Sequence, residues 1–72
     1  MEKTVNITTE FIKLEQLLKF ADLVGSGGEA KMLILDGQVM VNGEVCTQRG
    51  KKIRDNDRVE ALGATLIVRG QF

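Results

Sequence analysis

The sequence predicts an α+β domain in which two helices pack on a small, mostly antiparallel sheet. Three local patterns carry this prediction: an apolar helical spacing after residue 12, a capped second helix after residue 25, and a tight hairpin around residue 42. The expected order of elements along the chain is β-α-α-β-β-β-β. Because the chain has 72 residues, we expect one domain over 1–72.

The opening of the chain alternates apolar and polar residues over 4–8, which predicts a short strand. A helix is then predicted over about 14–23 from residues that follow the i, i+3, i+4, i+7 spacing of an amphipathic helix, namely Leu14, Leu17, Leu18 and Ala21. Lys13 stands at the start of this helix. Lys19 falls on the face opposite the leucines.

The run Gly25-Ser26-Gly27-Gly28 ends the first helix and starts a second one. Ser26 and Glu29 have the spacing of a capping box, and Asp36-Gly37 supplies a stop signal. The residues expected to face the core are Ala30, Leu33 and Ile34.

Two further apolar residues of this helix, Met32 and Leu35, point away from the core stripe. The helix is therefore apolar nearly all round, and something must cover its back. The opening and C-terminal strands are the expected cover within the chain. The alternative is that a partner protein covers the back of this helix.

The strongest local signal is Asn42-Gly43, which lies between the apolar runs 39–41 and 44–46. This pair favours positive φ at both positions and predicts a type I′ hairpin. Further along, 55–57 is expected to form a turn. Val59, Ala61 and Leu62 are expected in a strand, which Gly63 turns into a last strand over 65–69.

The residue types argue against catalysis and against a metal site. The chain has no His, the commonest general base and metal ligand. Its one cysteine, Cys46, has no second Cys or His to activate it, so we interpret it as a buried, inert thiol in a reducing compartment. Residues 25–28 could pass for a phosphate loop, but the Lys-Ser/Thr pair of a P-loop is missing. We expect no catalytic residue, no metal and no cofactor.

Basic and acidic residues cancel, ten against ten. Zero net charge is usually a point against nucleic-acid binding, which is largely electrostatic. However, half of the basic residues fall within ten positions, and these are Arg49, Lys51, Lys52, Arg54 and Arg58. Such a segment could form one basic face on a neutral molecule. A solvated loop that keeps the protein soluble explains the charges equally well.

Three runs of sequence resemble the S4-type RNA-binding domain: IKLEQLLK at 12–19, GGEAKMLI at 27–34 and GQVMVNGE at 37–44. Within that superfamily the chain is most similar to the small stand-alone YaaA/YbcJ-type S4-like proteins of bacteria. The resemblance covers about 11–62.

This resemblance implies an αL-type RNA-binding motif, in which two helices and the following hairpin form a groove for structured RNA. The RNA is expected to be ribosomal or transfer RNA. Matching by position implies a set of RNA-binding residues, namely Lys13, Lys31, Gln38, Asn42, Gly43, Arg49, Lys51 and Lys52. Arg54, at the end of the basic segment, is expected to help neutralise phosphates.

The chain departs from the S4 pattern on the helix face. Gly27 and Gly28 stand where many S4 domains carry Arg or Ser, and Met32 stands where many carry a second basic residue. We therefore expect weaker or more shape-dependent binding, with a larger share from 49–54. The sequence shows no exposed aromatic platform, which argues against a protein that stacks single-stranded bases.

We therefore expect a cytoplasmic, monomeric protein that binds structured RNA and is linked to ribosome assembly or translation. No membrane, small-molecule substrate or catalytic role is expected. The alternative is a protein-interaction module that docks through Met32 and Leu35. Ionic strength separates the two, because phosphate binding weakens steeply with salt and an apolar interface scarcely changes.

Overall fold

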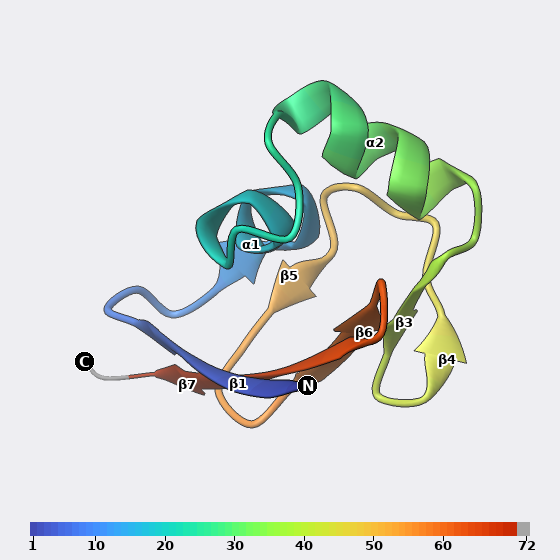
Figure 1. Cartoon of the computed structure of the whole chain (residues 1–72). Helices are drawn as coiled ribbons and strands as arrows, with labels where there is room; N and C mark the ends of the chain where they lie inside the picture. Colours follow the sequence, from blue (N-terminus) through green and yellow to red (C-terminus); the bar gives the residue numbers. More distant parts are fainter. Residues whose placement is uncertain (71–72) are drawn as a thin grey trace.

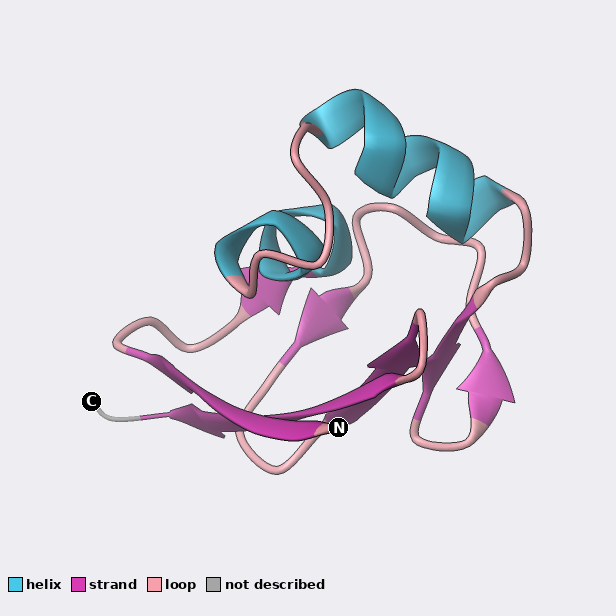
Figure 2. Ribbon diagram, viewed as in Figure 1, coloured by secondary structure: helices cyan, strands magenta, loops and turns pink. Residues whose placement is uncertain are grey.

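The computed structural model describes residues 1–70, and Gln71 and Phe72 lie outside it. Two helices lie over one face of the main sheet, and no helix of the described chain covers the other face (Figures 1 and 2). The elements in chain order are β1 (Glu2–Ile7), β2 (Ile12–Lys13), α1 (Leu14–Phe20), α2 (Gly27–Leu35), β3 (Val39–Val41), β4 (Glu44–Val45), β5 (Lys52–Ile53), β6 (Arg58–Ala61) and β7 (Ala64–Gly70).

The main sheet has five strands in the order β1-β7-β6-β3-β4. β1 runs parallel to β7, with Thr4 opposite Ile67, and the other neighbours pair antiparallel. The predicted α+β class, element order and mostly antiparallel sheet are confirmed. The sequence did not predict the second sheet, in which β2 and β5 pair over two residues each.

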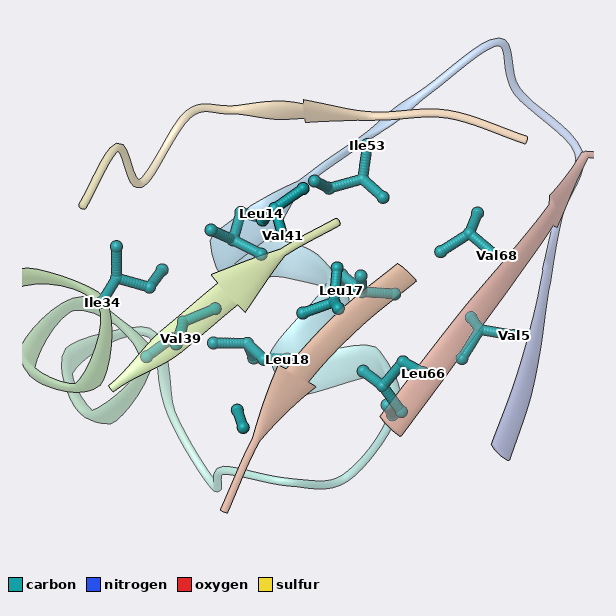
Figure 3. Packing of buried hydrophobic residues seen from close by; sticks show 14 of the residues in the cluster. Val5, Leu14, Leu17, Leu18, Ile34, Val39, Val41, Ile53, Leu66 and Val68 are labelled. Atoms are coloured by element: carbon teal, nitrogen blue, oxygen red, sulfur yellow. The ribbon is translucent and has the colours of Figure 1, made fainter. Parts of the chain in front are cut away.

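The core lies between the helices and the inner face of the main sheet (Figure 3). The three α1 leucines, Leu14, Leu17 and Leu18, are fully buried there, and each contributes about 1.5–3 kcal/mol by leaving water. From the strands, inward-facing residues alternate with exposed ones, as Val59 does in β6. Ile53 brings the short strand β5 into the same cluster.

Both predicted ends of α2 are confirmed. The Ser26 side chain accepts a hydrogen bond from the Glu29 N–H at 3.2 Å, so Ser26 caps the first turn. At the other end Gly37 has φ 75° and its N–H donates to the Ile34 carbonyl. The N–H of Gln38 donates to the Leu33 carbonyl, which completes a Schellman motif.

Two predicted boundaries were wrong. The first helix ends at Phe20 instead of about residue 23, because Asp22 adopts a left-handed conformation with φ 61° and the Leu23 N–H donates back to the Leu18 carbonyl. Leu62, expected in a strand, instead forms the β6–β7 turn together with Gly63. Leu62 has φ 52° and is 58% exposed. The predicted Asn42-Gly43 hairpin is confirmed, with φ 51° and 86°.

The back of α2 is not covered by strands of the described chain, which corrects the expected packing. Met32 is 69% exposed and Leu35 is 53% exposed. Cys46 is only partly buried and packs at the margin of the core, so its predicted burial is incomplete. Among residues 1–70, no helix has the length and apolar character needed to cross a membrane.

Candidate nucleic-acid interface

The basic segment 49–54 is held against the start of α1 by its own backbone. The Leu14 N–H donates to the Lys51 carbonyl at 2.9 Å, and the Glu15 N–H donates to the Arg49 carbonyl at 3.1 Å. No side chain caps this helix, since the N-cap residue is Lys13. The segment's carbonyls therefore accept hydrogen bonds from N–H groups that the helix itself leaves unpaired, and its backbone is fixed while its basic side chains stay exposed.

Three cations from three different segments meet in one hollow of about 370 Å³. Lys19 comes from α1, Lys31 from α2 and Arg49 from the basic segment. The other residues lining it are Glu15, Gln16, Gly27 and Gly28. We call this site the basic hollow.

The electrostatics of the basic hollow favour an anion. The N-terminal turn of α2 lies at its wall, and the helix dipole places partial positive charge there. Within residues 1–70, the N–H groups of Gly27 and Gly28 donate to no protein acceptor, and none of the three cations forms a salt bridge. Among the lining residues, the carboxylate of Glu15 opposes three positive side chains, and Glu29 follows in the first turn of α2.

The predicted residues Asn42 and Lys51 line a second hollow beside the β3–β4 hairpin. The Asn42 side chain is already engaged, because its Nδ2 donates to Asp57 Oδ1 at 3.1 Å and its Oδ1 accepts the Arg58 N–H at 2.9 Å. These bonds join the hairpin to the turn before β6. Gly43 at the hairpin tip has open space around its Cα.

Gln38 does not join the basic residues. Its Nε2 donates to Asp36 Oδ2 at 2.6 Å, and it lines a mostly apolar groove with Met32 and Leu62. Lys31 lines the basic hollow and not this groove. The structure therefore brings Lys31 and Arg49 together and leaves Gln38 apart from them.

Lys13, Lys52 and Arg54 form a third group, around the small sheet. Lys13 is paired with Lys52 across β2 and β5. The Lys52 Nζ lies 4.9 Å from the centroid of the Phe11 ring, and the Arg54 Cζ lies 5.6 Å from it. Phe11 is half-buried, and Phe20 at the end of α1 is 65% exposed, so the expectation of no exposed aromatic ring was wrong.

Gln16 and Lys19 also line the basic hollow, although neither was among the predicted RNA-binding residues. They are three apart in α1, a spacing that places them on the same face of a helix. That signal was present in the sequence, but nothing local indicated that the face would meet Arg49.

Comparison with known proteins agrees with this geometry. Residues 5–69 match the family model described as S4 domain. The chain belongs to the S4 domain family. It is also 43% identical, over 63 residues, to the protein named "Probable ribosome maturation protein RlbA" of Bacillus subtilis (strain 168), a match that covers 88% of this chain and 89% of that protein. The resemblance predicted from 11–62 is confirmed and extends over 5–69, and it supports an RNA-binding role for this S4 domain.

Proposed function

We propose that this S4 domain binds structured RNA, with ribosomal RNA as the first candidate, and contributes to ribosome assembly by binding and not by catalysis. The basic hollow is the observation that carries the proposal, because three cations without a salt bridge within residues 1–70 converge there with the start of a helix. The name of the Bacillus subtilis relative, a ribosome maturation protein, supports the link to the ribosome. The cytoplasmic location and the monomeric state stay predictions.

In this proposal the basic hollow receives the phosphates of one RNA strand. Lys19, Lys31 and Arg49 neutralise them, and the N–H groups of Gly27 and Gly28 donate to phosphate oxygens. Such contacts fix the position of the RNA and carry little sequence information. Recognition would then depend on the shape of the folded RNA, which agrees with the A-form helices that structured RNA presents.

The remaining predicted residues extend the surface in this proposal. Lys51 adds charge at the hairpin hollow, and Gly43 allows an RNA backbone to approach the hairpin tip. Gln38 and Asn42 contribute least, since both amides already bond within the protein.

Amide NMR mapping with a structured ribosomal RNA fragment tests the proposal. We expect amide chemical-shift changes at Lys19, at the start of α2 (27–31) and at Arg49. These changes should become smaller when the titration is repeated at higher salt. Shifts confined to the uncovered face of the sheet would contradict it. So would shifts that do not respond to salt.

A second candidate function is docking to a protein partner, favoured by the exposed apolar groove. Leu62 is 58% exposed, and it adopts positive φ, a backbone conformation that is costly for a bulky side chain. It lines the groove with Met32, and Glu29 and Asp36 lie at the same site. A fitting partner would present an apolar side chain flanked by basic residues. Binding that persists at high salt and is lost in Met32→Ser would favour this candidate.

A further inference from the structure

Phe11 is an aromatic ring that the core does not use. It is half-buried, and it is absent from the hydrophobic cluster formed by the helices and the sheet. Its neighbours are charged, since Lys52 and Arg54 both lie within 6 Å of the ring centroid. That range is typical of cation–π attraction. An aromatic ring held among cations at the surface is available to bind a ligand.

The arrangement is held in place by backbone pairing. Ile12 and Ile53 face each other across β2 and β5, and Ile53 is fully buried. Lys52 and Arg54 are the two neighbours of that buried residue, so alternation turns both of them outward. The Arg54 N–H donates to Asp57 Oδ2 at 2.7 Å, which fixes the far end of the segment.

We propose that Phe11, Lys52 and Arg54 form a subsite for one unpaired nucleotide of the bound RNA. The base stacks on the Phe11 ring and the Arg54 guanidinium, both of which are flat surfaces that bases use. Its phosphate is neutralised by Lys52 and by Lys13, which is paired with Lys52. The bases of a continuous duplex cannot reach such a ring, because they are stacked inside the helix.

This subsite rests on the proposed function, because it extends the same bound RNA. The basic segment connects the two places: Arg49 lines the basic hollow, and Lys52 and Arg54 lie at Phe11. β5 lies beside α1 (Figure 1). In this proposal, a paired stem whose phosphates occupy the basic hollow presents its next nucleotides toward β2 and β5. The preferred ligand is then a stem that adjoins a bulge or a loop, not an uninterrupted duplex.

Two RNA hairpins with the same stem test this inference, one fully paired and one with a single 2-aminopurine bulge. We expect the wild-type protein to bind the bulged hairpin about tenfold more tightly and to quench the 2-aminopurine fluorescence by stacking. Phe11→Leu should lose both the preference and the quenching. It should bind the paired hairpin as well as wild type does.

Phe20→Leu is the matched control, because Phe20 is 65% exposed at the end of α1 and lies outside the subsite. Phe11→Tyr, which retains a ring, should keep the preference. Equal binding of both hairpins by wild type, or a preference that survives in Phe11→Leu, overturns the subsite. If wild type does not quench the bulge, the subsite is refuted even where a variant fails to fold.

The failure of the subsite and that of the proposed function are distinguishable. If both hairpins bind equally and Arg49→Ala weakens both, only the subsite is wrong. If neither hairpin binds at any salt concentration, the proposed function and the subsite fall together.

Discussion

Replacing Lys31 and Arg49 by alanine removes two of the three cations of the basic hollow. Each phosphate contact contributes about 0.9 to the slope of log affinity against log salt for a duplex, so the slope should fall by about 2. At about 0.1 M salt the same relation assigns each contact roughly 0.9 log unit, or about eightfold. The double variant should therefore bind structured RNA about 60-fold more weakly at that salt concentration.

The fold should tolerate this change. Both side chains are exposed, and neither forms a salt bridge within residues 1–70. Surface substitutions of this kind alter the free energy of unfolding by less than about 0.5 kcal/mol. Fluorescence anisotropy with a labelled ribosomal RNA fragment at four salt concentrations gives the slope, and thermal unfolding followed by circular dichroism verifies the fold.

Arg58→Ala provides the control for net charge. Arg58 precedes the buried Val59 in β6, so its side chain lies on the opposite face of the sheet, which no helix of residues 1–70 covers. Its loss should change the affinity much less than the loss of Arg49 alone. The reasoning is refuted if Arg58→Ala and Arg49→Ala weaken binding equally, or if the double variant keeps the wild-type slope.

Three other variants test the surface and the turns. Lys51→Glu together with Lys52→Glu should weaken RNA binding by at least about tenfold with an unchanged unfolding temperature, and unchanged titrations with ribosomal RNA fragments would exclude this segment. Leu62→Asn should raise stability by about 1 kcal/mol, seen as a thermal midpoint about 4–8 °C higher, because asparagine accepts the positive φ of this turn; a lower midpoint would contradict the strain argument. Asn42→Gly keeps the positive φ but loses the hydrogen bonds to Asp57 and the Arg58 N–H. The free energy of unfolding in urea should therefore fall by about 1–2 kcal/mol. An unchanged free energy of unfolding would mean that these hydrogen bonds do not stabilise the fold.

The parts of the fold that the sequence predicted are those with local causes. Ser26 accepts from an N–H three residues ahead, and Asn42-Gly43 closes a turn between its immediate neighbours. The parts it missed depend on distant pairing. Ile12 and Ile53 form their two-residue strands only because each finds the other 41 positions away, and neither run has the length or alternation that indicates a strand.

The candidate site divides in the same way. Lys31 and Arg49 are predictable as cations, since the resemblance marks their positions, but their meeting with Lys19 depends on how α2 crosses α1. At the end of α1, by contrast, the sequence predicted more structure than is present. The apolar spacing continued to Ala21 and suggested a longer helix. The helix ends earlier because Asp22 adopts a left-handed backbone conformation, which apolar spacing does not predict.

The neutral net charge does not oppose RNA binding once distances are considered. The molecule measures 32 × 20 × 18 Å, and charges in water are screened over about 8 Å at physiological salt. Carboxylates on the uncovered face of the sheet, such as Glu60, are separated from the basic hollow by the thickness of the sheet and helix layers. A phosphate in the hollow is therefore governed by the nearby side chains, which are the three cations and Glu15 that line it and Glu29 in the first turn of α2. The local sum is positive, and the acidic residues elsewhere balance the charge of the whole chain without cancelling the field where the RNA would bind.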